Sequence, residues 1–492
     1  METRNRYAPS PTGLQHIGGL RTALFNYLFA RSAGGKFILR LEDTDRTRSD
    51  PAYVQNLYDS FTWLGFHWDE GPDVGGPSAP YIQSERSGVY QKYAQDLLDA
   101  GKAYRCFCSS ERLEKLREDR EKAHSAESGY DRLCRDIPPE TANARAAAGE
   151  PCVIRLKIPL EESTQFNDTL LGDIIWKNTD ISPDPVLLKS DGFPTYHLAN
   201  VADDHLMGIT HVLRAQEWLS STPLHVILYR AFGWEPPLFC HLPMVMGTDG
   251  KKLSKRHGAT SIDEFRRQGF LPEALINYVA LLGASYEEGK DMYTLDELAE
   301  RFSLEKLNKA PAIFDYKKLE WYNGQYIRMK SDRELADLAL PFAVEAGLFA
   351  GEKPRPDEME TFVSAMPLVR ERAVFLKELP DKIRYLFAEP PVPAAEDFIP
   401  KKLDLRQAVK LLKTGQDLVS ALSTADDTHA EELVKAAAEK ENVKLGDLLT
   451  PLRAALTGAR VSPPLFGSLR LLGAEKCLTR IDKALAALVD GE

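Results

Sequence analysis

The sequence predicts an α/β N-terminal half, built on a Rossmann-like parallel sheet with an inserted α+β domain, followed by an all-α C-terminal region. A strand, a glycine turn, a helix and a second strand follow one another in residues 4–43, which is the order of a βαβ unit. Helical periodicity without strand signals dominates after about residue 330. The 492 residues are too many for one hydrophobic core, so roughly two to five compact units are expected.

The first βαβ unit begins with a short strand from Arg4 to Ala8, which enters the turn PSPTG. Apolar residues recur at helical spacing from Ile17 onward, and Gly34-Gly35 supplies the stop signal of that helix. The run KFILRLED, residues 36–43, is typical of a buried strand with acids at its carboxyl end. Ligands of such sheets bind beyond the carboxyl ends of the strands, so a ligand site is expected there.

A second α/β stretch follows much later in the chain. Residues 209–218 (ITHVLRAQEW) are strand-like, and SSTPLHVILYRAF opens a helix with Thr222 as the expected N-cap and Pro223 at the first helical position. Between about 80 and 195 the sequence changes to a charged helix, a cysteine pair and short strands. An insertion that splits the first sheet is the most economical interpretation.

These changes of pattern divide the chain into five predicted parts. No internal repeat or low-complexity tract interrupts their order. The parts are a split sheet domain at 1–80 and 198–248, an inserted domain at 81–197, a domain with the basic loop KLSKR at 249–330, and two helical subdomains at 331–388 and 389–492.

Composition narrows the function classes. The net charge of −11 argues, taken alone, against a nucleic-acid binder, because basic side chains make the phosphate contacts. Local patches nevertheless decide such contacts. No apolar run approaches the ~20 residues of a membrane span, and METRNRYAPS lacks the apolar core of a signal peptide. Six cysteines in so long a chain do not resemble a disulfide framework, so a cytoplasmic protein without membrane contact is expected.

Two elements with phosphate-binding character stand far apart in the sequence. His16 and Gly18-Gly19 lie where the first turn becomes a helix, and a helix N-terminus with free amides suits a phosphate. The loop GTDGKKLSKRHGA carries Lys252, Lys255 and further cations between glycines, and such a cluster can neutralise a polyphosphate. Each element alone is also typical of an ordinary helix start or a solvated basic loop. Their presence together favours a nucleotide site.

Together these elements resemble the class I aminoacyl-tRNA synthetases. HIGG, from His16 to Gly19, resembles the signature HIGH, although its last histidine is glycine here. KLSKR, from Lys252 to Arg256, resembles the signature KMSKS. The strings APSPTG, LEDTD, LKSDGFPTYHLANVADDHLMGITHVLRAQEW and LRAALTG resemble the bacterial glutamyl-tRNA synthetases, and this similarity extends over nearly the whole chain.

The resemblance implies a glutamate–tRNA ligase that works in two steps. The α-carboxylate of L-glutamate attacks the α-phosphorus of ATP to give glutamyl-adenylate and pyrophosphate, and the 3′-terminal adenosine of tRNA-Glu then receives the glutamyl group. Catalysis would rest on positioning and charge stabilisation by His16, Lys252 and Lys255, with Mg²⁺ accompanying ATP. The implied ATP-binding positions are Ala8, His16, Gly18, Glu217, Lys252, Ser254 and Lys255, with Trp218 beside them.

The resemblance also implies a glutamate pocket. Its six positions are Arg6, Ser10, Glu42, Tyr196, Asn200 and Arg214. Glu42 would face the ammonium group, and the planar fork of arginine suits the carboxylates. Glutamine lacks the side-chain charge and would leave a buried arginine poorly paired, which favours its rejection. The alternative is that Arg6 and Glu42 merely pair with each other on neighbouring strands.

The cysteines of the inserted domain could surround a structural Zn²⁺. Cys106, Cys108 and Cys134 supply three thiolates, and Tyr130 or Asp136 would be the fourth ligand. Asp136 stands where the family's usual pattern has histidine, and some family members carry such a zinc while others lack it. The alternative is a set of buried, reduced cysteines, which we also expect for Cys152, Cys240 and Cys477.

The helical tail resembles the anticodon-binding region of bacterial glutamyl-tRNA synthetases, whereas glutaminyl enzymes carry β-barrels there. Single-stranded anticodon bases can be read on their edges by arginine. The resemblance leaves open whether tRNA-Gln is charged as well as tRNA-Glu, with Arg372 as the expected determinant. The implied contact positions are Arg370, Arg372, Arg453, Ser462, Pro463 and Leu465.

Three rival functions fit the sequence less well. A tRNA-modifying glutamyl transferase shares the catalytic half but lacks an anticodon-binding tail. A nucleotidyltransferase that acts on a small molecule would have no use for the C-terminal third. A degenerate, non-catalytic RNA-binding relative would be expected to lose the basic loop, which is intact here. We therefore expect a synthetase, acting as a monomer.

Overall fold

The computed structural model describes residues 2–45, 47–124 and 129–489, without the side chains of 255 and 489. The chain divides into two compact units, Met1–Phe265 with Leu275–Asp315, and Arg266–Ala274 with Tyr316–Glu492. The first unit contains parallel strands and helices, and the described elements of the second are all helical. The predicted fold class is confirmed.

The main sheet of the first unit is built from parallel strands, and an antiparallel hairpin extends it. β1 pairs in parallel with β2, β8 pairs in parallel with β9, and β5 joins β9 in parallel at Asp168↔Phe239. The amide of Thr210, just before β8, donates to the Arg4 carbonyl at 2.8 Å and brings β1 beside β8. The hairpin β5–β6 comes from the range predicted as an insertion. The strands are β1 Arg4–Tyr7, β2 Lys36–Leu39, β3 Ala103–Cys106, β4 Val153–Leu156, β5 Ser163–Asp168, β6 Gly172–Lys177, β7 Val186–Leu188, β8 His211–Ala215, β9 Leu238–Leu242, β10 Val245–Met246 and β11 Ala312–Ile313.

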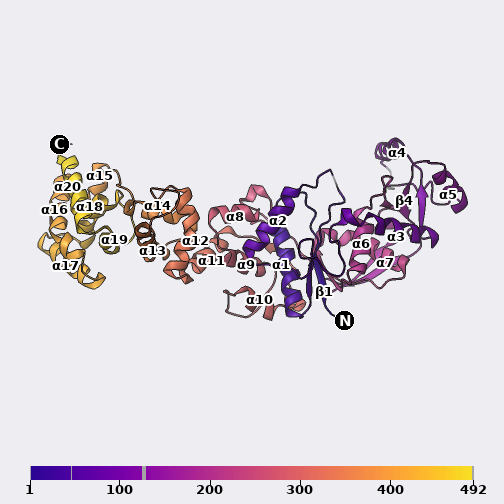
Figure 1. Cartoon of the computed structure of the whole chain (residues 1–492), viewed down its shortest axis with the longest axis horizontal. Helices are drawn as coiled ribbons and strands as arrows, with labels where there is room; N and C mark the ends of the chain where they lie inside the picture. Colours follow the sequence, from indigo (N-terminus) through magenta and orange to yellow (C-terminus); the bar gives the residue numbers. More distant parts are fainter. Residues whose placement is uncertain (1, 46, 125–128, 490–492) are drawn as a thin grey trace. The chain divides into compact units, whose positions relative to one another are not determined.

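The helices of the first unit cover this sheet and the smaller antiparallel sheet β3-β4-β7 (Figure 1). Helix α1 ends at the predicted glycines: Gly34 has φ +60°, and a side chain at Gly35 would lie 2.2 Å from the Thr3 carbonyl. That close approach lets the Lys36 amide donate to the same carbonyl at 2.8 Å and begin β2. The helices are α1 Ile17–Ser32, α2 Pro51–Leu64, α3 Ser87–Asp99, α4 Ser110–Lys122, α5 Pro139–Ala147, α6 Tyr196–Leu206, α7 Thr222–Phe232, α8 Ile262–Gln268, α9 Pro272–Ala280 and α10 Leu295–Arg301. Helices α8 and α9 cross the boundary between the two units.

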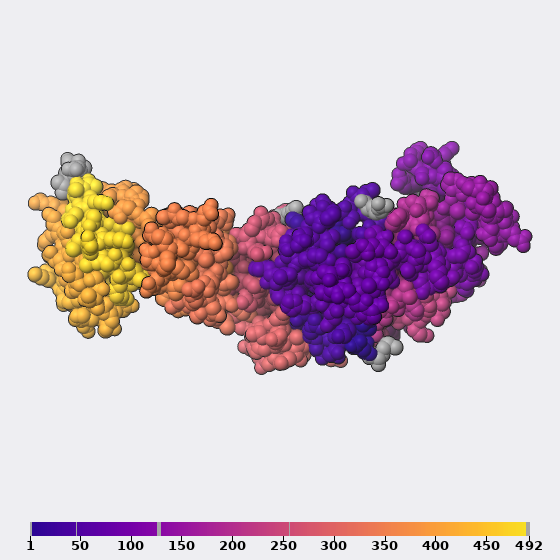
Figure 2. All heavy atoms as spheres, viewed as in Figure 1, coloured from indigo at the N-terminus to yellow at the C-terminus, as the bar shows by residue number. Residues whose placement is uncertain are grey.

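The second unit is a succession of packed amphipathic helices. In α16, Leu411, Leu412, Val419 and Leu422 are buried at helical spacing, and Asp404 caps the helix by accepting from the Gln407 amide. Figure 2 shows the atoms of α16–α20 (amber to yellow) packed into one solid body on the viewed face. The helices are α11 Tyr316–Met329, α12 Asp332–Glu345, α13 Pro356–Arg370, α14 Leu379–Ile383, α15 Ala395–Phe398, α16 Leu405–Leu422, α17 Asp427–Lys440, α18 Leu445–Thr457, α19 Leu465–Leu472 and α20 Ala474–Val489.

Two local expectations need correction. Thr222 does not cap α7: it is the first helical residue, and its hydroxyl bonds Arg214 instead, because a short 3-10 turn at Gln216–Ser221 leads directly into the helix. Cys152 is half-buried rather than buried, whereas Cys240 and Cys477 are buried as expected. Among the described helices, none combines the length and apolar character that crossing a bilayer requires.

Candidate active site

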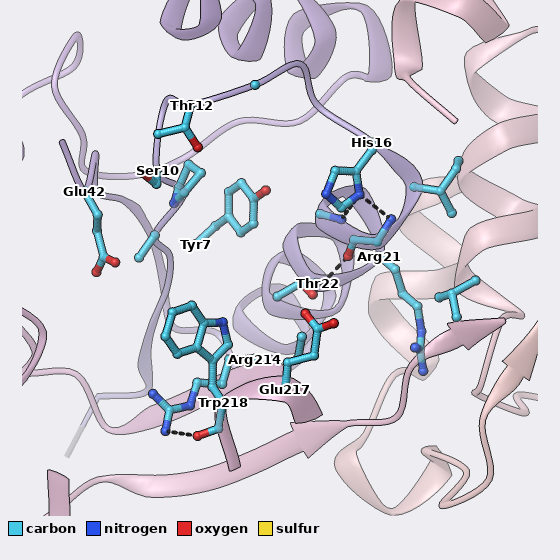
Figure 3. Close-up of a pocket in the computed structure, with 18 of the residues that line it drawn as sticks. Tyr7, Ser10, Thr12, His16, Arg21, Thr22, Glu42, Arg214, Glu217 and Trp218 are labelled. Atoms are coloured by element: carbon cyan, nitrogen blue, oxygen red, sulfur yellow. Dashed lines mark hydrogen bonds between the residues drawn. The ribbon is translucent and has the colours of Figure 1, made fainter. Parts of the chain in front are cut away.

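One pocket of about 1130 Å³ opens at the carboxyl ends of β1, β2 and β8, where the sequence predicts a ligand site. Figure 3 shows Glu42 and Arg214 on one side of it and His16 on the other. Lys255 falls outside the described side chains. The pocket is lined by all the other predicted ATP and glutamate positions, namely Arg6, Ala8, Ser10, His16, Gly18, Glu42, Tyr196, Asn200, Arg214, Glu217, Lys252 and Ser254.

His16 is both the N-cap of α1 and a donor to the pocket. Its Nδ1 accepts from the amides of Gly18 at 3.1 Å and Gly19 at 3.2 Å, which fixes the proton of the neutral ring on Nε2. Burial and the nearby Lys252 lower the pKa of His16, which favours this neutral form. A Cβ on Gly19 would lie 2.7 Å from the Tyr7 hydroxyl, so the second glycine permits close packing against β1. The imidazole therefore offers one N–H to an anionic ligand.

The basic loop is joined to the sheet edge through Lys252. The ammonium group of Lys252 pairs with the Glu217 carboxylate. His257 holds the loop from behind: its Nδ1 accepts from the Ser254 amide at 3.0 Å, and its Nε2 lies 3.1 Å from the Asp249 carboxylate. Since the Lys252–Glu217 pair is exposed to solvent, a polyphosphate can compete with Glu217 for the ammonium group.

Arg6 and Glu42 do not pair with each other, contrary to the alternative raised from the sequence. Arg6 donates to both carboxylate oxygens of Asp204, at 2.9 and 3.1 Å, while Glu42 accepts from Arg40 at 3.0 Å and from Asn200 at 3.2 Å. Burial raises the pKa of Glu42, and the guanidinium groups of Arg40 and Arg6 oppose this rise. For Asp204 these two cations outweigh burial, and its pKa lies below the usual range.

Arg214 is a buried cation whose partners are all neutral. Its guanidinium donates to the Thr222 hydroxyl at 2.8 Å, the Nε2 of His241 at 3.0 Å and the Tyr196 hydroxyl at 3.1 Å. Within the described part of the chain, no carboxylate forms an ion pair with it, and it is 5% exposed. Burial lowers its pKa without removing its charge. The pocket wall thus holds a positive charge that an acidic ligand can neutralise.

Sequence reasoning missed Asp204, Arg40, Asp168 and His241, all of which are buried. A carboxylate pair inside a helix with buried apolar neighbours, such as Asp203-Asp204 in α6, is a signal that could have revealed buried partners for Arg6 and Arg40. Asp168 and His241 offered no such local signal.

Three thiols meet within the range predicted as an insertion. The sulfur atoms of Cys106, Cys108 and Cys134 lie within 4.8 Å of one another. The Tyr130 hydroxyl is 3.3 Å from the Cys106 sulfur and 3.7 Å from that of Cys108. The Asp136 side chain is 91% exposed, with Lys157 at 4.0 Å. The donor set therefore fits a thiolate-preferring metal such as Zn²⁺, and Tyr130 is the better placed of the two candidate fourth ligands.

The predicted anticodon positions occupy different environments within the helical unit. Arg453 is fixed by the Ser462 hydroxyl at 2.6 Å and the Pro463 carbonyl at 2.8 Å, and its pKa is lowered by burial and by the charge of Arg372. Arg372 is exposed. Arg370 is bound to the Lys330 carbonyl at 3.0 Å, and Leu465 is buried. Four of the positions, Arg372, Arg453, Ser462 and Pro463, thus form one basic, partly exposed cluster.

Comparison with known proteins agrees with this fold and pocket. Residues 2–321 match the catalytic domain of class I tRNA synthetases (E and Q), and residues 334–485 match an anticodon-binding domain. The fold and its pocket define a class I aminoacyl-tRNA synthetase.

Relatives over the full length narrow this assignment. The chain is 57% identical to the glutamate–tRNA ligase of Treponema denticola over 99% of each chain, and 49% identical to that of Borreliella burgdorferi over 98% of each. A crystal structure of a glutamate tRNA ligase from Elizabethkingia meningosepticum, in complex with its amino acid, has a TM-score of 0.86 and 35% identity, and the match covers 99% of this chain and all of that one. The chain therefore belongs to the glutamate–tRNA ligase family.

Proposed function

We propose that the pocket binds L-glutamate beside ATP and activates it for transfer to tRNA-Glu. One observation supports this proposal most directly. An uncompensated cation, Arg214, and a buried acid, Glu42, lie on the same side of the pocket without contacting each other (Figure 3). Arg214 receives the side-chain carboxylate of glutamate, and Glu42 receives its ammonium group. The α-carboxylate is then directed toward His16, across the pocket.

The chemistry requires positioning more than proton transfer. A carboxylate is already ionised at neutral pH, so no general base is needed for its attack on the α-phosphorus. His16 donates its Nε2–H to a phosphate oxygen, while Lys252 and Lys255 neutralise the charge that develops as pyrophosphate leaves. The tRNA 3′-terminal adenosine then takes the glutamyl group and AMP leaves. Mg²⁺ would arrive with ATP, bound through the phosphates rather than by a protein cage.

Two further parts of the chain serve this function. Cys106, Cys108, Cys134 and Tyr130 would hold a structural Zn²⁺ that stabilises the inserted domain, for which we propose contact with the acceptor stem. The cluster of Arg372, Arg453, Ser462 and Pro463 reads the anticodon, supported by the buried Leu465 and by Arg370. The cytoplasm, where ATP and tRNA are available, is the proposed location. The five domain boundaries and the monomeric state stay predictions from the sequence.

Aminoacylation tests the proposal. The purified chain is incubated with ATP, Mg²⁺ and labelled glutamate, with tRNA-Glu, tRNA-Gln or no tRNA, and acid-precipitable label is measured. Label on tRNA-Glu alone identifies a discriminating enzyme, and label on both tRNAs a relaxed one. If labelled glutamine is charged in place of glutamate, or nothing is charged, the assignment of Arg6, Glu42 and Arg214 is wrong.

A further inference from the structure

Behind the pocket, three residues on adjacent strands form a continuous line of hydrogen bonds. The Asp168 carboxylate lies 2.6 Å from Nδ1 of His241, and Nε2 of His241 accepts from Nε of Arg214 at 3.0 Å. We propose that Asp168 and His241 are positioning residues that fix the orientation of the Arg214 guanidinium for the side-chain carboxylate of the substrate. This inference rests on the proposed role of Arg214.

The sheet itself brings the three residues together. Arg214 on β8 is in register with His241 on β9, and β5, which ends at Asp168, joins β9 at the neighbouring pair Asp168↔Phe239. Asp168 and His241 are fully buried, so no solvent competes for these hydrogen bonds. The hairpin of the inserted region thereby contributes a residue to the support of the amino-acid pocket.

The partners allow one tautomer of His241. An ionised Asp168 is only an acceptor, so Nδ1 of His241 must carry the proton and donate it. The guanidinium of Arg214 is only a donor, so Nε2 must present its lone pair. Burial keeps the pKa of His241 below its usual value, in spite of Asp168, and the ring stays neutral. An imidazolium, or the other tautomer, would place an N–H against the N–H of Arg214.

The remaining contacts of Arg214 follow the same pattern of neutral support. Thr222, released from capping α7, accepts at 2.8 Å. The His225 Nδ1 lies 3.4 Å from Nη1 of Arg214, and the His225 Nε2 lies 3.1 Å from Nδ1 of His197. A carboxylate in direct contact would occupy the guanidinium, as Asp204 occupies that of Arg6. Placing the carboxylate of Asp168 one imidazole away orients Arg214 and leaves its charge available to a ligand.

Asp168 also has a structural task that the test must separate from the proposed one. Its Oδ1 accepts from the amides of Leu170 at 3.0 Å and Leu171 at 2.8 Å, while its Oδ2 accepts both from the backbone amide of His241 at 3.1 Å and from Nδ1 of the His241 ring. In Asp168→Asn, the amide oxygen keeps more bonds when it faces the two turn amides, and the NH₂ group then faces His241, where the bond from the His241 backbone amide is lost and the NH₂ group can donate only to the ring. Nδ1 of His241 must become an acceptor, which moves the proton to Nε2, against Arg214.

The test compares Asp168→Asn with Thr164→Val, a control in the same strand. The Thr164 hydroxyl is buried and donates to Asn178 at 2.6 Å, so it takes no part in the Asp168–His241–Arg214 line of hydrogen bonds, which we call the relay. With tRNA-Glu present, we expect Asp168→Asn to raise KM for glutamate roughly tenfold to hundredfold, the effect of one hydrogen bond to a charged group, with KM for ATP unchanged. Thr164→Val should lower Tm without changing either KM. An Asp168→Asn enzyme with unchanged KM for glutamate, or with both KM values raised in parallel, overturns the proposal.

The tautomer gives a readout independent of activity. In the ¹⁵N-histidine spectrum of the full chain, the signal of His241 is the one that disappears in His241→Gln. In the wild type this signal should show a protonated Nδ1 and an unprotonated Nε2. In Asp168→Asn it should show an unprotonated Nδ1 and a protonated Nε2. A protonated Nε2 in the wild-type chain overturns the relay, whether or not a variant folds. If the wild-type chain charges no tRNA with glutamate, the proposed function fails and the relay with it. If wild-type charging is normal while Asp168→Asn keeps its KM, the relay alone fails.

Discussion

Arg6, which lines the pocket, forms a bidentate ion pair with the buried Asp204, with N–O distances of 2.9 and 3.1 Å. Asp204 also accepts from Arg40 at 2.7 Å, so one buried carboxylate holds two guanidinium groups. The charge of Arg6 is thereby compensated within the protein, whereas that of Arg214 is not. This difference divides the arginines of the site into one that builds the pocket and one that is free to receive a ligand's charge.

Replacing Asp204 with asparagine should therefore weaken folding more than it weakens any single substrate contact. Arg6 loses its carboxylate partner, Arg40 loses one of its carboxylate partners, and we expect the free energy of unfolding to fall by about 3 kcal/mol at neutral pH. Asp96→Asn, which breaks an exposed ion pair with Lys92, should change it by less than about 1 kcal/mol. Urea unfolding of both variants measures this, and an equal effect of the two substitutions would contradict it.

The decrease in the free energy of unfolding caused by Asp204→Asn should depend on pH with a defined sign. The pKa of Asp204 is lowered in the folded chain, so its contribution is present above the unfolded value of about 3.9 and is lost as pH falls through the lower folded value. The stability deficit of Asp204→Asn should therefore shrink progressively with acidification. A deficit that stays constant from neutral to acid pH would show that the carboxylate charge is not its cause.

The Arg214→Lys variant tests the uncompensated cation. Lysine keeps the charge but loses the planar fork and the hydrogen bonds to His241 and Thr222, so KM for glutamate should rise roughly tenfold or more. Arg230→Lys, on the exposed side of α7, is the matched control and should leave KM unchanged. Steady-state aminoacylation at varied glutamate concentration separates these outcomes. Similar KM values for both variants would remove Arg214 from the glutamate site.

The sequence predicted the contents of this pocket better than its internal connections. His16 and Glu42 could be placed at one sheet edge, because they lie at the turn and the strand end of one βαβ unit, whereas Tyr196 to Arg214 were assigned to the same pocket by the resemblance to glutamyl-tRNA synthetases. The partner of Arg6 lies 198 positions away, so no local pattern reveals it. The same is true of His241 and Asp168, which meet only because β5 joins β9.

Local capping signals also had limits. Thr222 followed by proline is a good N-cap pattern, yet the preceding 3-10 turn continues into α7, and the hydroxyl serves Arg214 instead. The negative net charge argued against RNA binding, although exposed Arg372 and half-buried Arg453 lie close enough for one to lower the pKa of the other. Total charge does not report such local clusters.

Lys252 is expected to act on ATP rather than on folding. Its ammonium group pairs with Glu217 at an exposed position, and removal of an exposed pair costs little stability. We expect Lys252→Ala to lower kcat roughly a hundredfold or more through lost charge stabilisation, with Tm unchanged. The neighbouring exposed Lys251→Ala is the control and should keep kcat. Pyrophosphate exchange in the presence of tRNA measures both, and an unaltered kcat in Lys252→Ala would exclude the catalytic role.

Substitutions at Tyr130 and Asp136 distinguish the two candidate fourth ligands of Zn²⁺. Tyr130→Phe removes the hydroxyl that lies 3.3 Å from the Cys106 sulfur, and Asp136→Ala removes an exposed carboxylate. Metal analysis after dialysis should find about one Zn²⁺ per chain in the wild type and in Asp136→Ala. Tyr130→Phe should retain less, and Cys134→Ser should retain none. Loss of metal from Asp136→Ala but not from Tyr130→Phe would make Asp136 the fourth ligand. A metal-free wild type would favour the alternative that these cysteines are buried, reduced thiols.

Arg372 provides the test of the anticodon proposal. It is exposed, and its charge already lowers the pKa of Arg453, which Ser462 and Pro463 hold in place. If Arg372 contacts an anticodon base, Arg372→Ala should raise KM for tRNA-Glu roughly tenfold and leave KM for ATP unchanged. Arg333→Ala removes an exposed arginine that pairs with Asp337 in α12, and should have little effect. Charging of tRNA-Gln by the two variants shows whether Arg372 discriminates between the tRNAs. If the charging of tRNA-Gln relative to tRNA-Glu rises only in Arg372→Ala, Arg372 is the discriminating residue. Equal loss for both tRNAs makes it a general contact to the RNA backbone, and no change in either KM places the anticodon elsewhere on the helical unit.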